Sequence, residues 1–347
     1  MPVSVSPFRW GSGVALVATG ALTGGLLLAA PAHAKIEYGS VRAGGSVSSN
    51  GTPTSGTCTP TNAAQPASKT FTDNGVAVRQ SQSRTSTLKW SGNANDVITA
   101  QQSGAMTVKA MPITAGGGRI DFSGSAAFSA SPKIAASKCR LGGSASLSAG
   151  ADFVLPVGMW ATLNGSANSV GSADVSVSIY RAESNSSGLR ITVGGSKANG
   201  ATAAYLPAGS YYADAEFYAY GSTRLEGATV KPVAASVSGS GAISFTPGGA
   251  ASPVTGKGAR FVALGARSCV TNAVSAGVTT KARKRAAKVV IKVNGARKVT
   301  LKGKKLKRAS AVSLAGLAPT SNVNVVATIT PKKGKKVTVA RSYRACR

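Results

Sequence analysis

The feature that most limits the fold of this chain is a set of short stretches in which apolar and polar residues alternate. Residues 174–180 read DVSVSIY and residues 188–194 read GLRITVG, so every second side chain is apolar. Successive side chains of a strand point to opposite faces, so this period of two predicts half-buried strands. No long segment keeps the spacing of an amphipathic helix. We therefore expect an all-β fold of antiparallel β-sandwich modules in tandem. For residues 39–68, rich in Gly, Ser, Thr and Pro, disorder is the alternative.

The N-terminal residues predict export. Arg9 is followed by an apolar run at 13–30 and then by Ala32-His33-Ala34, which has the A-x-A pattern of a cleavage site. We expect a signal peptide over residues 1–34 and a mature chain that begins at Lys35, with no transmembrane segment. The predicted location is extracellular, either free or loosely associated with the cell wall.

Composition divides the mature chain into blocks. Residues 35–142 predict an N-terminal β region with a polar opening, and residues 143–247 predict a jelly-roll-like β-sandwich. Residues 248–258 are rich in Gly, Ala, Ser and Pro and predict a linker. Residues 259–347 predict a basic sandwich. The sequence leaves open whether the first two blocks fold as one domain.

Four cysteines remain after export: Cys58, Cys139, Cys269 and Cys346. They show no C-x-x-C spacing, and the single histidine, His33, lies in the signal peptide, so no zinc site and no cofactor is expected. An even count in an exported chain favours two disulfides. Of the three pairings, we expect Cys58 with Cys139 and Cys269 with Cys346, because each bridge then stays within one block.

Charge is distributed unevenly along the chain. Lys and Arg number 40 against 10 Asp and Glu, and the last acidic residue is Glu226. Residues 227–347 carry 24 basic side chains and no acidic one. Such asymmetry indicates an anionic partner.

The basic residues of the last block form runs at 281–288, 302–308 and 332–336. Each run lies in a connection between predicted strands, which we place at 266–271, 288–293, 297–301, 311–314, 323–330 and 336–346. If successive strands are antiparallel, the first, third and fifth connections emerge at one pole, opposite the linker and the last disulfide. We therefore expect a cationic tip made of Lys281, Arg283, Lys284, Arg285, Lys288, Lys302, Lys304, Lys305, Lys307, Arg308, Lys332, Lys333, Lys335 and Lys336.

Crowded cations repel one another, and an anionic polymer would relieve that repulsion and release counterions. The expected partners are anionic cell-envelope polymers or acidic glycans, ahead of anionic lipid head groups and free nucleic acid. No aromatic residue lies within the runs, so sequence-specific nucleic-acid binding is not expected. The alternative is that the lysine-rich loops keep an exported β protein soluble and its sheet edges unpaired.

The strand predicted at 211–220 offers a second candidate site. One face carries Tyr211, Ala213, Ala215, Phe217 and Ala219 and suits a core. The other face would present candidate carbohydrate-binding residues: Tyr212, Asp214, Glu216, Tyr218 and Tyr220. Flat aromatic rings beside carboxylates suit sugar rings. The alternative is an ordinary half-exposed sheet face or a contact between blocks.

Two resemblances to known families follow from these segments. Residues 174–180, DVSVSIY, and 206–212, LPAGSYY, resemble the β-sandwich modules called bacterial pre-peptidase C-terminal domains, which implies an accessory secreted module. Cys269 and the segments VIKVNG (290–295), VSLAGL (312–317) and YRAC (343–346) resemble the small Ig-like modules at the C-terminal ends of secreted bacterial proteins. That likeness implies a spacer or attachment module. The Trp of antibody-type domains is missing, so only the sandwich architecture carries over.

Catalytic machinery is not recognisable in the sequence. The mature chain has no His, no G-x-S-x-G and no phosphate-binding loop. A Ser-Lys dyad stays open, and Asn93, Asn95 and Asp96 carry oxygens that suit calcium, although such residues commonly just form turns. The sequence thus predicts a secreted, non-enzymatic structural or attachment protein of the bacterial cell envelope with a cationic C-terminal tip. The alternative is a carbohydrate-binding module that uses the tyrosine face.

Overall fold

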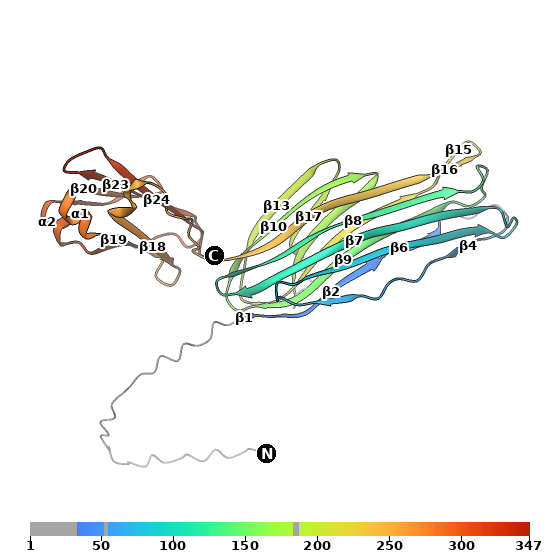
Figure 1. The fold of residues 1–347 in the computed structure, drawn as a ribbon, viewed down its shortest axis with the longest axis horizontal. Helices are drawn as coiled ribbons and strands as arrows, with labels where there is room; N and C mark the ends of the chain where they lie inside the picture. The colour runs from blue at the N-terminus through green and yellow to red at the C-terminus, as the bar shows by residue number, and fades with distance from the viewer. Residues whose placement is uncertain (1–32, 52–54, 183–186) are drawn as a thin grey trace, which may run out of the picture. The chain divides into compact units, whose positions relative to one another are not determined.

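The computed structural model describes residues 33–51, 55–182 and 187–347, and the described residues form two β-sandwiches, one up to residue 247 and one from residue 248 (Figure 1). The predicted signal peptide, residues 1–34, lies outside the described residues except for His33–Ala34, which form β1. The expectation of an all-β, antiparallel sandwich fold is confirmed.

The described part of residues 33–247 forms two large antiparallel sheets. The first contains β1 (His33–Ala34), β4 (Cys58–Thr61), β6 (Ala77–Trp90), β7 (Val97–Thr114), β8 (Gly117–Pro132), β10 (Met159–Val170), β13 (Ala198–Leu206) and β17 (Val233–Pro247). The second contains β2 (Ile36–Gly44), β3 (Val47–Ser49), β5 (Lys69–Phe71), β9 (Leu141–Leu155), β11 (Ser172–Arg181), β12 (Ser187–Gly194) and β14 (Gly209–Ser222). Their orders are β13-β10-β17-β8-β7-β6-β4, with β1 paired to β7, and β12-β11-β14-β9-β2-β5, with β3 paired to β9. A separate hairpin joins β15 (Arg224–Glu226) to β16 (Thr229–Lys231).

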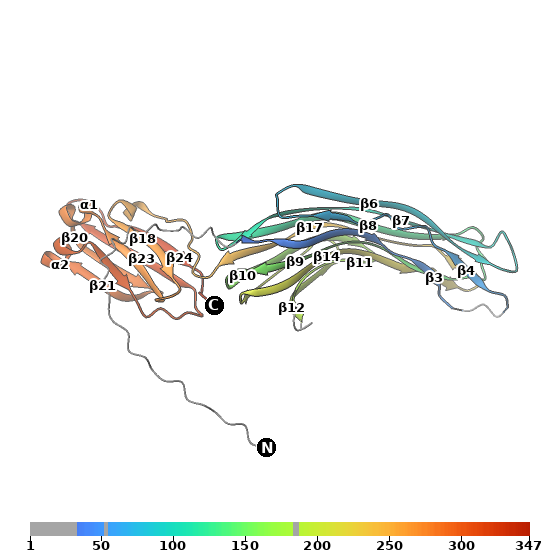
Figure 2. The ribbon, with the colours of Figure 1, turned by 90° about the horizontal axis from the view of Figure 1, so that it is seen from below.

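The two sheets lie face to face as layers and share one core (Figure 2). That core extends from Ile36 to Phe245, and it contains residues of both predicted N-terminal blocks. The boundary expected at residue 142 falls inside β9, which pairs with β2 on one side and with β14 on the other. The two blocks are therefore one sandwich, because β9 lies between strands from both of them.

Polar side chains replace apolar ones where β6 and β7 cover β2 and β9. Gln82 Nε2 donates to the carbonyl oxygens of Gly44 and Ser146, at 3.0 Å each. Arg84, only 8% exposed, donates to the carbonyl oxygen of Gly44 at 2.8 Å, and Gln102 Nε2 donates to that of Ser144 at 2.6 Å. Since Gly44, Ser144 and Ser146 belong to the second sheet, these hydrogen bonds join the two layers in addition to the apolar packing of the core.

We predict that Arg84→Leu destabilises the protein by about 1–3 kcal/mol, because it removes the guanidinium hydrogen bonds to the carbonyl oxygens of Gly44, Gly45 and Ala63. Arg79→Leu, at an exposed position of the same strand, is the matched control. Urea unfolding of both variants measures the difference. An equal loss of stability in the two variants would contradict the role given to the buried guanidinium.

The described residues from 248 onward form the smaller sandwich. Its elements are η1 (Lys257–Arg260), β18 (Val262–Ser268), β19 (Ala273–Val278), α1 (Thr280–Arg285), β20 (Ala286–Val293), β21 (Ala296–Lys302), α2 (Gly303–Arg308), β22 (Ala311–Leu314), β23 (Val323–Pro331) and β24 (Val337–Tyr343). The strand orders are β18-β19-β22 in one sheet and β21-β20-β23-β24 in the other. Of the seven strands in chain order, the first, second and fifth (β18, β19 and β22) share one sheet. The third, fourth, sixth and seventh (β20, β21, β23 and β24) share the other. This is an Ig-like arrangement in which the fourth strand pairs with the third.

Three features of this sandwich differ from the sequence-based prediction. Strand β19 was not predicted, because its six residues are small and include a glycine, and the first expected strand, 266–271, covers only the end of β18 and the turn after it. Residues 248–258, predicted as a linker, lie along β24 through the bridges Ala251–Tyr343 and Thr255–Ala340. Two of the expected connections contain the six-residue helices α1 and α2.

The described cysteines form the expected pairs, Cys58–Cys139 and Cys269–Cys346. Their Cα atoms are 5.8 Å and 5.5 Å apart, which are ordinary separations for disulfides. The first bridge ties the start of β4 to the segment before β9. The second ties the residues after β18 to those after β24.

Candidate functional site

Strand register places the three basic runs at one end of the sheet β21-β20-β23-β24. Lys288 at the start of β20 pairs with Lys302 at the end of β21. Ala286, which begins β20, pairs with Pro331, which ends β23. Helix α1 enters β20 at this end, α2 leaves β21 there, and the loop 332–336 leaves β23 there, as the labels of Figure 1 show for the helices. We call this end, with the fourteen Lys and Arg residues of the three runs, the cationic pole.

Small buried anchors hold the cationic pole together. Ala282 of α1 and Leu306 of α2 are buried in the core, at 0% and 2% exposure, and the two helices contact each other. Thr279 Oγ1 caps α1 by accepting a hydrogen bond from the Ala282 amide at 3.2 Å. The Lys332 amide donates to the Arg285 carbonyl at 2.9 Å, which ties the loop 332–336 to α1.

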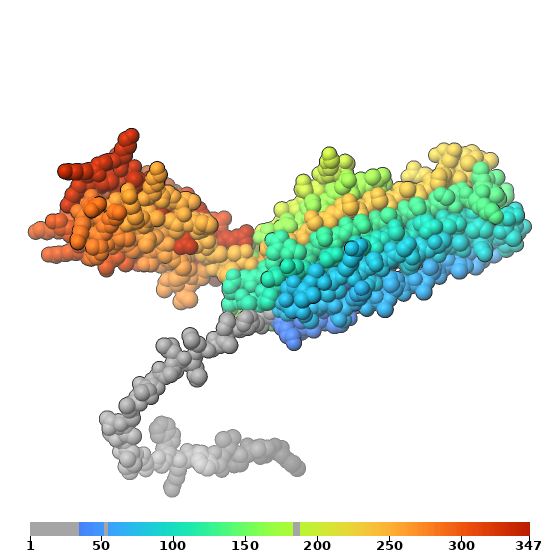
Figure 3. Space-filling model, in the orientation of Figure 1, coloured from blue at the N-terminus to red at the C-terminus, as the bar shows by residue number. Residues whose placement is uncertain are grey.

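The charged side chains of the cationic pole point outward, with one exception. Arg283 is half-buried, and its guanidinium donates to Thr280 Oγ1 at 3.0 Å, so it supports α1. The other thirteen residues are exposed. In Figure 3 the orange and red segments of this sandwich carry side chains that project into solvent at this end. Because residues 227–347 include no acidic residue, no carboxylate side chain of this sandwich neutralises these charges.

A cleft of about 520 Å³ lies between α1 and the loop 332–336. One wall carries Lys281, Lys284 and Arg285, and the other carries Lys332, Lys333 and Lys335. Phe261, Pro331, Gly334, Val337 and Arg260 complete the lining. The Arg260 guanidinium lies over the Phe261 ring, 5.2 Å from its centroid. Cations on two walls suit a ligand that carries more than one anionic group.

The sequence did not single out Arg260 or Phe261 as site residues. Arg260 is isolated from the three runs along the chain, and Phe261 is 4% exposed and forms part of the core. Helix η1, which contains Arg260 and precedes Phe261, contacts β23 and β24, the strands on either side of the loop 332–336. No sequence signal marks the two residues before that contact is known.

The tyrosine face of β14 has the predicted alternation. Tyr211, Ala213, Ala215, Phe217 and Ala219 are buried. Tyr212 and Tyr220 are exposed, at 38% and 47%, and Asp214, Glu216 and Tyr218 are half-buried. Glu216 has a small residue on each side, since it pairs with Ser176 on β11 and with Ser148 on β9. The rings of Tyr218 and Tyr220 pack together at 5.4 Å between centroids.

The carboxylates on this face have raised pKa values. Burial raises the pKa of Asp214, and the nearby Arg190 guanidinium offsets part of that effect. The pKa of Glu216 is also raised, first by burial and then by the charges of Asp214 and Asp174. Each group therefore binds its proton more tightly in the folded chain than in the unfolded chain.

This shift predicts a pH dependence of stability. A carboxyl group with a raised pKa contributes its full stability below its ordinary pKa and loses that contribution as the pH rises through the raised value. Asp214→Asn removes the ionisable group, so we expect the variant to gain stability over wild type at pH about 7 and to lose that advantage near pH about 3.5. Urea unfolding of both proteins at both pH values measures the difference in their free energies of unfolding. A gain that is the same at both pH values would contradict the account.

The oxygens considered for calcium are used by the protein itself. Asp96, 1% exposed, accepts hydrogen bonds from Ser137 Oγ at 2.5 Å and from the Lys138 amide at 2.7 Å. Asn95 Oδ1 accepts from Lys133 Nζ at 3.1 Å. Among residues 33–51, 55–182 and 187–347 there is no group of three or more His, Cys, Asp or Glu that suits a metal ion.

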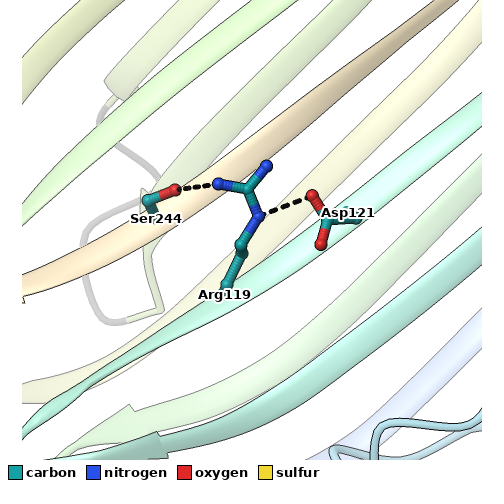
Figure 4. A network of polar contacts seen from close by, with 3 residues as sticks. All are labelled: Arg119, Asp121 and Ser244. Atoms are coloured by element: carbon teal, nitrogen blue, oxygen red, sulfur yellow. Dashed lines mark hydrogen bonds and ion pairs between the residues drawn. The ribbon is translucent and has the colours of Figure 1, made fainter.

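A polar network on β8 was also not predicted. Arg119 Nε donates to Asp121 Oδ1 at 2.6 Å, and Arg119 Nη1 donates to Ser244 Oγ of β17 at 3.2 Å (Figure 4). The network borders a shallow depression of about 280 Å³. The spacing i, i+2 on one strand is the only sequence signal for the Arg119–Asp121 pair. The link to Ser244 requires the pairing of β8 with β17.

Comparisons with known proteins give little further information. No family model matches this chain, and a search of curated proteins finds no match. Among solved structures, the adhesin domain of Epf from Streptococcus pyogenes is similar over 76% of this chain and 90% of that chain, at 9% identity and a TM-score of 0.20. At this TM-score the likeness carries no argument about this chain. Neither α1 nor α2, the α-helices of the described residues, has the length and apolarity to span a membrane.

Proposed function

We propose that this chain is an exported, non-enzymatic attachment protein whose cationic pole holds an anionic polymer of the cell envelope or an acidic glycan. The observation that carries this proposal is the cleft between α1 and the loop 332–336, whose two walls together carry six cations. The two disulfides fit an oxidising, extracellular setting.

The chemistry of the cleft favours a polymer over a single small anion. Six cations of the basic runs line it and seven more are exposed elsewhere on the cationic pole, so a chain with repeated negative charges makes many contacts at once and releases many counterions. Most of these cations are lysines, whose flexible stems adapt to charges that are irregularly spaced. An extended polyanion can therefore run through the cleft and across α2.

The lining of the cleft argues against nucleic acid as the intended polymer. Phe261 is the aromatic residue of the cleft, and at 4% exposure its ring face is covered. Single-stranded nucleic acid is held by stacking bases on exposed aromatic rings, which this cleft does not provide. Lysines that could bind the phosphates of a nucleic acid can also bind the charged groups of other polyanions. Selectivity between polyanions therefore depends on the polymer backbone that carries the charges.

We predict that the triple variant Lys284→Gln, Lys333→Gln and Lys335→Gln binds dextran sulfate roughly tenfold or more weakly at low salt, because it removes charge from both walls. The matched control removes the same charge from the exposed side chains Lys292, Arg297 and Lys298, around the β20–β21 turn at the opposite end of the same sheet. The measurement is the dissociation constant of the full chain between about 50 and about 200 mM NaCl.

The expected results separate local from general electrostatics. The logarithm of affinity should fall linearly with the logarithm of salt concentration for wild type, and the slope should decrease in the cleft variant but change little in the control. Equal losses in both triple variants would mean that net charge alone drives binding. Binding that salt does not affect would reject the electrostatic mechanism altogether.

A further inference from the structure

A second pocket, of about 530 Å³, lies at the end of the tyrosine face, far along the chain from the cationic pole. It is formed by the start of β11, the end of β14, the β15–β16 hairpin and the start of β17. Its polar lining consists of Ser172, Tyr220, Ser222, Arg224, Glu226 and Lys231. The volume lies within the range of about 300–1,000 Å³ that small-molecule sites occupy.

The hairpin that walls this pocket is fixed at two points. Thr223, 3% exposed, donates from its amide to the Leu141 carbonyl at 2.8 Å, and its Oγ1 accepts from the Leu141 amide at 2.9 Å. Val230, 2% exposed, donates from its amide to the Ala135 carbonyl at 2.8 Å. The wall is therefore preformed, so a ligand does not have to order it on binding.

Two cations meet across the hairpin. Arg224 of β15 is directly opposite Lys231 of β16, and like charges in that position disfavour each other. Glu226 compensates only in part, because its Oε2 is 4.0 Å from Lys231 Nζ and both side chains are about half exposed or more, at 66% and 49%. An anionic group bound between Arg224 and Lys231 would relieve the remaining repulsion.

Tyr220 adds a flat apolar surface beside these charges. Its side chain is 47% exposed, and the Tyr218 ring packs against it at an interplanar angle of 31°, which limits its motion. Tyr220 also pairs in register with Ser172, which lines the same pocket. An aromatic ring with hydroxyl and carboxylate groups around it is the arrangement that holds a sugar ring.

We propose that this pocket binds an acidic sugar residue, a pyranose ring that carries a carboxylate. The ring stacks on Tyr220, the carboxylate lies between Arg224 and Lys231, and the sugar hydroxyls bond to Ser172, Ser222 and Glu226. The site goes beyond the proposed function, since it uses none of the residues of the cationic pole. It also narrows the predicted carbohydrate face to one end of β14, with Tyr212 about 26 Å away along the strand.

The test uses the full chain and two probes, methyl glucuronide and methyl glucoside, titrated by ligand-observed NMR. We expect saturable binding of the glucuronide and at least tenfold weaker binding of the glucoside. Tyr220→Ala and Arg224→Gln should each weaken glucuronide binding at least tenfold, whereas Tyr220→Phe should keep it, which separates loss of the ring from loss of the fold. Tyr212→Ala is the matched control, and it should bind like wild type.

Several results would overturn the proposal. These are the absence of saturable glucuronide binding, equal binding of the two probes, and loss of binding in Tyr212→Ala but not in Tyr220→Ala. The triple variant Lys284→Gln, Lys333→Gln and Lys335→Gln should bind glucuronide like wild type. If it does not, the probe binds at the cationic pole and the pocket is not the site. Failure here leaves the polyanion test unaffected, because that test uses dextran sulfate and other variants.

Discussion

The antiparallel pairing of β21, β20 and β23 determines where the basic residues of the smaller sandwich lie. Because Lys288 pairs with Lys302 and Ala286 pairs with Pro331, three segments that lie far apart in sequence start or end at the same edge of one sheet. Each segment brings four or five basic residues to that edge. Register, not sequence proximity, therefore concentrates the charge.

This concentration works against folding, and local packing compensates for it. Clustered exposed cations repel one another, most strongly at low ionic strength. The buried side chains of Ala282 and Leu306, together with the Thr279 cap, hold α1 and α2 against the core. The Cys269–Cys346 bridge ties the ends of β18 and β24 together, away from these helices. The polyanion of the proposed function would relieve this repulsion, which is the physical reason for proposing it.

The sequence predicted which face of a strand is buried better than it predicted where one domain ends and the next begins. Alternation correctly assigned Tyr211 and Phe217 to the core and Tyr212 and Tyr220 to the surface, because in a strand that choice follows from period two alone. It did not reveal that β9 runs through residue 142, since which strands become neighbours depends on contacts distant in sequence. The link between the two layers by Gln82 and Arg84 was also hidden, because buried polar residues mimic an exposed strand face.

The convergence of the three basic runs survives a missed element, whereas the predicted place of the linker does not. With β19 present, β18 begins at the cationic pole, so residues 248–258 run along β24 and end at that pole instead of opposite it. The expected strands omitted β19, which shifts every later connection by one place. All three basic runs come after β19, so they shift together and still alternate with the connections at the other pole. Their common pole depends only on the strands between them. The cleft itself was beyond prediction, because it needs Arg260 and Phe261 beside the loop 332–336.

Lysine footprinting by mass spectrometry locates the polyanion contacts of the cationic pole residue by residue. Acetylation rates of individual lysines are compared with and without dextran sulfate on the full chain. We predict protection of Lys281, Lys284 and Lys333, which line the cleft, and unchanged rates at Lys292 and Lys298 near the opposite end of the sheet. Protection spread evenly over both groups, or confined to Lys292 and Lys298, would contradict this prediction.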